Sequence, residues 1–142
     1  MIKAINPEEI SEYICEQDRN SENPTVWKLG VLDSRIMGFI DDTVTKLEYS
    51  GKGRNDPADP VFITGTRRWL LVKYGLRGWS NFFNIDGNPI TEKFDSTNHF
   101  GKTYPTVSDD VLRIIPVDVI AELAAEIQKQ NKLTPEEKVP LV

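Results

Sequence analysis

The sequence has very few of the residues on which catalysis and metal binding usually depend. Among its 142 residues there is one cysteine, Cys15, and one histidine, His99. A single cysteine excludes an internal disulfide, so a reducing cytoplasm is the expected place of synthesis. One cysteine and one histidine are also too few to build the usual structural zinc sites.

Long hydrophobic runs are missing as well. No apolar stretch approaches the roughly 20 residues that a membrane-spanning helix needs. Residues 1–6 lack the apolar run of a secretory signal, so we expect neither a leader nor a membrane partner. A basic excess is also lacking: the formal net charge is −5, which disfavours nucleic acid as a partner.

The charges that are present are unevenly distributed. Residues 51–79 carry six Lys or Arg against two Asp, whereas residues 80–142 carry ten acids against six bases. Regions of opposite sign can pair within the fold, pair between copies of the chain, or form solvated faces. The sequence leaves these alternatives open.

Apolar residues at three- and four-residue spacing predict about four main helices. The most regular stripe comprises Val117, Ile120, Leu123, Ala124 and Ile127. It follows Pro116, which cannot continue a preceding helix but can open the next. A shorter helix is predicted after Asn6-Pro7, because Asn caps free backbone N–H groups and Pro suits the first helical position. The predicted helices span residues 7–16, 34–49, 64–75, 108–115 and 116–130.

Segments rich in β-branched and aromatic residues predict strands over 25–32 and 61–63. The sequence Asp86-Gly87-Asn88-Pro89 is a strong turn signal and predicts two further short strands that it joins. Residues 93–107 are polar and predict irregular structure. Together these elements predict an α+β fold in a single domain, with about four helices packed on a small, mostly antiparallel sheet.

Two polar segments are predicted to lie at the margin of this fold. Residues 50–60 are rich in Gly and Pro, and form either a flexible connection or an arm that reaches a partner. Residues 132–142 form a C-terminal extension with room for no more than one further helical turn. If the chain is a component of a larger particle, we expect both segments to make contacts with other molecules.

No motif in the sequence carries a reaction. His99 lies in a polar segment without a nucleophile motif, so an exposed or turn-stabilising role is expected. Cys15 has acidic neighbours that raise a thiol pKa, which favours a small buried residue over a nucleophile. Gly101-Lys102-Thr103 resembles the end of a phosphate-binding loop but lacks the first glycine of that motif. We therefore expect no enzymatic activity, cofactor, metal or small-molecule substrate.

What remains is surface for binding other proteins. Aromatic and arginine side chains are common anchors of protein interfaces, although most aromatic residues of a small domain are expected in its core. The candidate contact residues are Lys52, Arg54, Arg67, Arg68, Trp79, Phe83, Leu133, Val139 and Leu141.

Four stretches carry a family resemblance: 23–29 (NPTVWKL), 72–82 (VKYGLRGWSNF), 86–89 (DGNP) and 115–134 (IPVDVIAELAAEIQKQNKLT). They resemble small proteins encoded in the structural modules of tailed bacteriophages. The resemblance implies a role in the virion or in its assembly. It also implies other phage structural proteins and copies of the chain itself as partners, in the host cytoplasm during assembly and then in the particle.

Three roles are open under this resemblance. The chain is expected to be a non-enzymatic particle component, such as a decoration, neck, connector or tail protein held in symmetric copies. The first alternative is an assembly chaperone that is absent from the finished particle. The second is a small inhibitor of a host protein, for which net acidity would suit a basic target.

Overall fold

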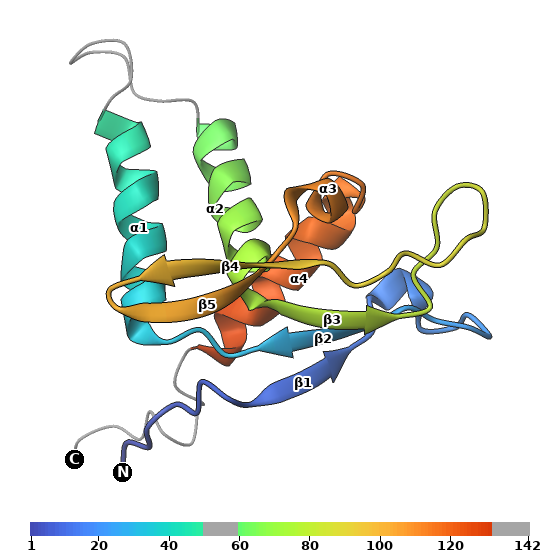
Figure 1. Ribbon diagram of the computed structural model, residues 1–142, viewed down its shortest axis with the longest axis horizontal. Helices are drawn as coiled ribbons and strands as arrows, with labels where there is room; N and C mark the ends of the chain where they lie inside the picture. The colour runs from blue at the N-terminus through green and yellow to red at the C-terminus, as the bar shows by residue number, and fades with distance from the viewer. Residues whose placement is uncertain (50–59, 132–142) are drawn as a thin grey trace.

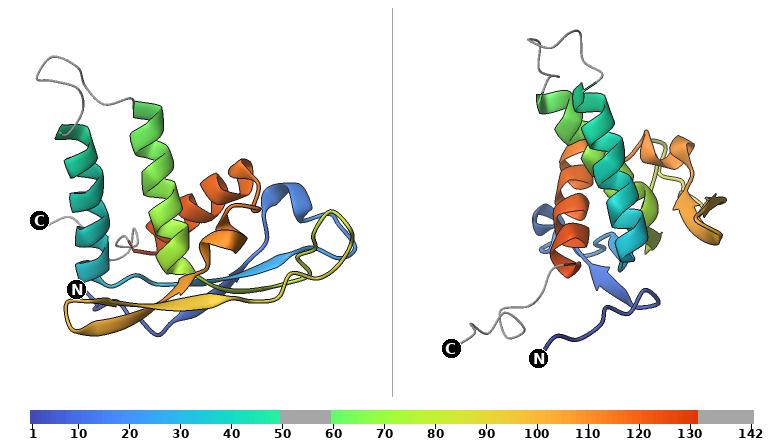
Figure 2. Two further views of the ribbon diagram at one scale, coloured as in Figure 1. Left: turned by 45° about the horizontal axis from the view of Figure 1, so that its top comes forward. Right: turned by 90° about the vertical axis from the view of Figure 1, so that its left-hand side faces the viewer.

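The computed structural model describes residues 1–49 and 60–131, and in this part of the chain there are four α-helices and two small antiparallel sheets (Figure 1). The predicted α+β class is therefore confirmed. Viewed from its edge, the strand layer has the helices gathered on one side (Figure 2, left). The elements in chain order are β1 (Ile10–Tyr13), the 3-10 helix η1 (Glu16–Asp18), β2 (Val26–Gly30), α1 (Ser34–Tyr49), α2 (Pro60–Gly75), β3 (Leu76–Ser80), β4 (Phe94–His99), β5 (Lys102–Val107), α3 (Asp109–Leu112) and α4 (Val117–Gln130).

The larger sheet has the strand order β1-β2-β3, with β2 in the centre and antiparallel to both neighbours. On β2 the side chains of Trp27 and Leu29 are buried whereas Lys28 is exposed, which is the two-residue alternation of a half-buried strand. Trp27 lies opposite Trp79 of β3, so two large aromatic residues anchor the register of this pair. The predicted strand over 25–32 is confirmed as β2.

The smaller sheet is the hairpin of β4 and β5, in the segment for which irregular structure was predicted. That prediction is wrong. The two strands pair from Phe94 opposite Val107 to His99 opposite Lys102. Their two-residue turn, Phe100-Gly101, has positive φ at both positions, the conformation that matches the twist of a hairpin. Polar β4 residues have low strand propensity, but β5 packs on α2 and β3, and this packing together with pairing outweighs propensity.

Three further predictions from the sequence are wrong. The expected helix over 7–16 is replaced by β1, because pairing with the open edge of β2 outweighs the helix-start signal of Asn6. Residues 61–63 belong to α2 rather than to a strand, since Pro60 opens that helix. Around the confirmed turn after Asn84, one isolated bridge between Phe83 and Pro89 stands where two short strands were predicted.

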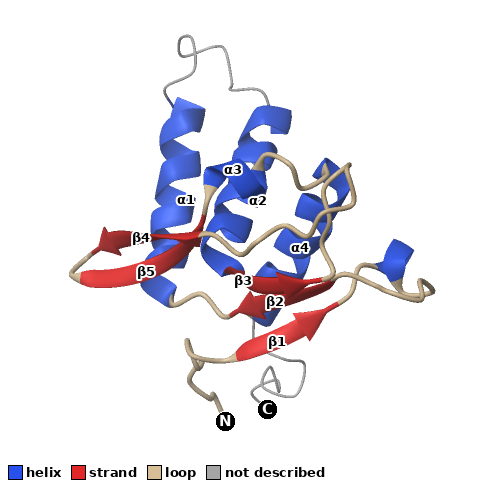
Figure 3. Cartoon of the chain, turned by 45° about the vertical axis from the view of Figure 1, so that its right-hand side comes forward, coloured by secondary structure: helices blue, strands red, loops and turns tan. Residues whose placement is uncertain are grey.

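The core lies where α4, α2 and the larger sheet meet (Figure 3). The predicted stripe of α4 is confirmed for its four buried members, which are Ile120, Leu123, Ala124 and Ile127. Val117 is the exception, because it is 75% exposed at the start of the helix. In the described residues, no helix is long and apolar enough to cross a membrane.

Gly75, at the junction of α2 and β3, packs directly against α4. A methyl group added at Gly75 would lie within 3.0 Å of three side-chain carbons of the buried Ile127. We predict that Gly75→Ala lowers the free energy of unfolding by about 1–3 kcal/mol, because a packed core does not absorb extra volume. Denaturant titration would measure this change.

Gly65 provides a matched control in the same helix. It is exposed, and a methyl group there would meet no atom within 4 Å. Gly65→Ala should raise stability by about 0.5–1 kcal/mol, since alanine loses less backbone entropy in a helix. Equal effects of the two substitutions would contradict the close packing of Gly75 on α4.

Candidate functional site

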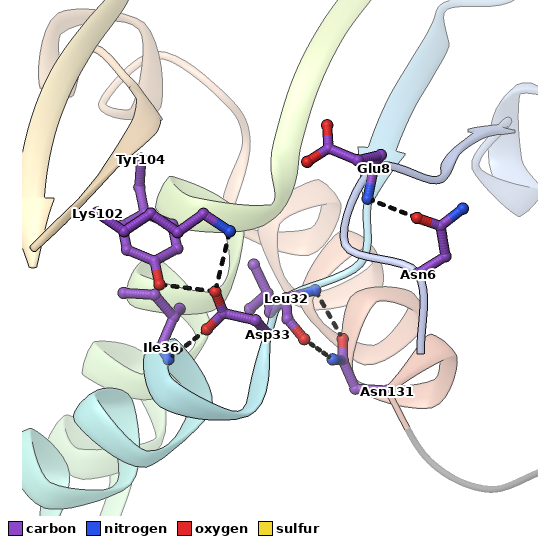
Figure 4. Close-up of polar contacts among 8 residues, drawn as sticks. All are labelled: Asn6, Glu8, Leu32, Asp33, Ile36, Lys102, Tyr104 and Asn131. Carbon is purple, nitrogen blue, oxygen red and sulfur yellow. Dashed lines mark hydrogen bonds and ion pairs between the residues drawn. The ribbon is translucent and has the colours of Figure 1, made fainter. Parts of the chain in front are cut away.

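Asp33, at the start of α1, is the centre of a polar cluster that ties the β4–β5 hairpin to the helices (Figure 4). Its carboxylate accepts hydrogen bonds from the Ile36 backbone N–H (2.9 Å), the Tyr104 hydroxyl (2.6 Å) and Lys102 Nζ (3.4 Å). Burial alone would raise the pKa of Asp33, but these three hydrogen bonds outweigh burial and lower the pKa. A carboxylate that accepts this many hydrogen bonds from the chain itself holds the hairpin and the helix together and is not free to act as a catalytic base.

The same cluster explains Lys102, which the sequence places in a partial phosphate-loop motif. Lys102 begins β5 and pairs with Asp33, so it lies on a strand instead of between a strand and a helix. A cavity of about 190 Å³ lies beside this ion pair, and Arg77 also lines it. Arg77 donates to the backbone oxygen of Tyr74, a bond that secures the junction of α2 and β3.

His99 is engaged in packing at the end of β4. Its Nε2 lies 2.7 Å from the Tyr74 hydroxyl, and its ring centroid lies 4.5 Å from that of Phe39. The side chain is half-buried and lies beside the hairpin turn, so of the two roles expected from the sequence the structure fits the turn-stabilising one rather than the exposed one. Contact with four aromatic neighbours, Phe39, Tyr74, Phe100 and Tyr104, gives this histidine a structural role.

Cys15 is buried, as predicted, and it is far from His99. Burial, reinforced by the nearby Glu122 carboxylate, raises the pKa of the Cys15 thiol to about 12. The thiol is therefore protonated at neutral pH and is not a nucleophile. Cys15 directly precedes η1, which lies at the opposite end of the molecule from the end of β4 (Figure 1). The two residues do not form a catalytic pair, and no described His, Cys, Asp or Glu residues form a metal-binding group.

A first surface depression, which we name the acidic cavity, opens beside the start of α4 with a volume of about 350 Å³. Its aromatic wall is formed by Trp27 and Phe82, whose ring centroids are 4.9 Å apart. Among its described lining residues three are carboxylates and none is basic. The lining residues are Cys15, Gln17, Asp18, Thr25, Trp27, Phe82, Pro116, Asp118, Val119 and Glu122.

The three carboxylates of the acidic cavity are not equally free. Glu122 accepts hydrogen bonds from the Tyr13 hydroxyl (2.6 Å) and the Glu16 N–H (3.0 Å). Burial opposes ionisation of Glu122, yet these bonds prevail and lower its pKa, helped by the charge of Arg19. Asp18 accepts from the Thr25 N–H (2.6 Å), whereas Asp118 is exposed in the first turn of α4. Asp118 is therefore the carboxylate most available to a partner.

A second depression, which we name the basic groove, lies between α2 and the connection from α3 to α4, with a volume of about 460 Å³. Ile114 and Val117 line it and are 54% and 75% exposed. Arg68 and Arg113 are also exposed, and neither forms an ion pair within residues 1–49 and 60–131. The lining residues are Gly65, Arg68, Trp69, Leu112, Arg113, Ile114, Ile115, Pro116, Val117 and Ile120.

The contact residues predicted from the sequence have different outcomes. Arg68 lines the basic groove, whereas the neighbouring Arg67 is ion-paired with Asp41 of α1. Phe83 is 48% exposed and stays a candidate. Trp79 is only 5% exposed, so its prediction as a surface contact is wrong. The other five predicted contact residues lie outside the described residues; they are Lys52, Arg54, Leu133, Val139 and Leu141.

The burial of Trp79 follows from its position on β3, a strand that the sequence analysis missed. Its ring faces the core, and its Nε1–H donates to the Ile90 backbone oxygen at 2.8 Å. Arg113, Ile114 and Val117 were not selected as contact residues. The sequence feature that could have indicated them is the apolar run around Pro116. This run holds more large side chains than a short helix and the start of the next helix can bury.

The Asp33 cluster predicts how stability depends on pH. The pKa of Asp33 is lower in the folded than in the unfolded chain, where it is about 3.9. Its contribution is complete above the unfolded pKa and is lost as pH falls through the folded pKa. Tyr104→Phe should lower the free energy of unfolding by about 1–2 kcal/mol at pH 7, and by less below the folded pKa of Asp33.

Denaturant titrations of both proteins at a series of pH values would measure this difference. Asp95→Asn is a suitable control, because Asp95 is exposed and its carboxylate makes no hydrogen bond or ion pair with another described residue. An effect of Tyr104→Phe that is the same at pH 7 and in acid would show that the ionised Asp33 is not its partner.

Comparisons with protein-family models, with curated proteins and with solved structures gave no match to this chain. Proposals about its function therefore depend on its residues, its two surface depressions and the phage resemblance of its sequence.

Proposed function

We propose that this chain is a non-enzymatic structural protein of a tailed bacteriophage particle, in a decoration, neck, connector or tail position, and that it works by binding other proteins. Its sequence resemblance supports the phage setting. The exposed basic groove supports the binding role and is the observation that carries the proposal.

The groove has the composition of a protein-binding surface. Ile114 and Val117 present apolar side chains to water, and burying such side chains is worth about 1.5–3 kcal/mol each. Half-buried Trp69 forms part of the wall, and tryptophan and arginine are enriched among residues that dominate binding energy. A partner that covers these side chains would gain this free energy on binding.

The charge of the groove indicates the chemistry of that molecule. Arg68 and Arg113 lie beside an apolar floor with no acidic residue among its described lining. A guanidinium binds a carboxylate through two parallel hydrogen bonds, which fixes orientation as well as affinity. The partner surface should therefore carry Asp or Glu next to apolar side chains.

Mass spectrometry of purified phage particles that encode this chain tests the proposal. We expect the chain in the particles, in a fixed ratio to the major capsid protein. A copy number near that of the capsid protein would indicate decoration, whereas a small fixed number would indicate a neck or tail ring. Absence from particles, with abundance in infected cells, would overturn the proposal in favour of a chaperone or a host inhibitor.

A matched pair of variants tests the groove itself. Val117→Asp should reduce incorporation into particles at least about tenfold, because it replaces an apolar contact with a hydrated carboxylate that competes with the partner's carboxylates for Arg68 and Arg113. Ile85→Asp is the control, since Ile85 is fully exposed on a turn and does not line the groove. Incorporation would be measured after complementing a phage that lacks the gene, with circular dichroism to establish that both variants fold.

Equal incorporation of the two variants would mean that the basic groove is not the binding surface.

A further inference from the structure

The acidic cavity and the basic groove lie on opposite faces of the first turns of α4. Pro116, just before the helix, lines both depressions. Val117 and Ile120 line the groove, whereas Asp118 and Glu122 line the cavity. Successive residues of an α-helix are rotated by about 100°, so these two sets point roughly 150° apart. The two depressions therefore face different directions in space.

The two depressions are also complementary in charge. The described lining of the acidic cavity includes three carboxylates and no basic residue. The described lining of the basic groove includes two arginines and no acidic residue. Glu122 is occupied by internal hydrogen bonds and is close to Arg19, which leaves Asp118 as the most accessible negative group. Both depressions also have large apolar walls, so each offers the chemistry that the other requires.

We infer that copies of this chain associate head to tail, with the basic groove of one copy on the acidic cavity of the next. This inference rests on the proposed protein-binding function and names the partner as a second copy of the chain. Arg113 of one copy enters the acidic cavity of its neighbour, where Asp118 pairs with the guanidinium. Half-buried Phe82, in the wall of the cavity, offers an aromatic ring for a cation–π attraction to the same group.

The opposed directions determine the symmetry of such an assembly. A two-fold pair joins one surface patch to the same patch of its partner, and it cannot engage two depressions on opposite faces in one contact. Head-to-tail contacts leave one groove and one cavity free at the ends, so they continue until a ring closes or a filament grows. We therefore expect more than two copies in the closed assembly.

Charge reversal on each face tests the inference. Sedimentation velocity of the full chain, at concentrations up to about 300 µM and moderate salt, should show species larger than a dimer. Arg113→Glu and Asp118→Lys should each weaken self-association at least about tenfold. Raising the salt concentration should weaken the association of the unaltered chain, because these charges lie near the surface.

Mixing the two variants gives the most specific readout. Asp118→Lys retains a basic groove and Arg113→Glu retains an acidic cavity, so their equimolar mixture should recover association that neither shows alone. Lys3→Glu and Asp95→Lys are the controls, since both residues are exposed and lie outside the two depressions. These controls should associate like the unaltered chain, and thermal melting by circular dichroism would establish that all four variants fold.

A chain that stays monomeric up to the highest concentration would overturn the inference, as would variants that associate like the unaltered chain or a mixture that does not recover. Its failure is distinguishable from failure of the proposed function. A monomeric chain that is nonetheless stoichiometric in particles refutes self-association alone. A chain that associates as described but is absent from particles refutes the particle role alone.

Discussion

The packing of α4 against the end of α2 is the contact on which the rest of the structure depends. Ile127 of α4 lies against Gly75, where a side chain of any size would force the two elements apart. The same junction leads directly from α2 into β3, so this contact also positions the larger sheet, to which β3 belongs. Burial of the apolar stripe of α4 provides the hydrophobic free energy that holds this arrangement together.

Fixing α4 in this way also determines what is left on the surface. The apolar face of α4 packs in the core, whereas the first turn of this helix extends beyond the core. Val117 therefore stays exposed on one side, and Asp118 on the other. The two depressions are consequences of one helix start that the core does not cover, which is why they share Pro116 and have opposite directions.

The polar residues that could have carried chemistry are used for structure instead. Asp33 holds the hairpin to α1, His99 packs among aromatic rings, and Cys15 is kept protonated by burial and by Glu122. Every buried polar side-chain atom in the described residues has a hydrogen-bond partner, so these groups are satisfied within the fold.

The sequence by itself determined the elements whose information is local. The periodic apolar residues of α1 and α4, the helix opening at Pro116, the strand β2 and the burial of Cys15 were all predictable, because each follows from neighbours along the chain. The α+β class followed from these elements.

Only the tertiary structure decided the elements that depend on pairing between distant segments. β1 and the β4–β5 hairpin have weak or contrary local signals, and they exist because partner strands and α2 offer hydrogen bonds and apolar contacts. The burial of Trp79 and the opposed placement of the two depressions have the same origin. Whether β3 buries Trp79, and what packs beside the start of α4, is set by contacts with segments far away in sequence, which local periodicity does not describe.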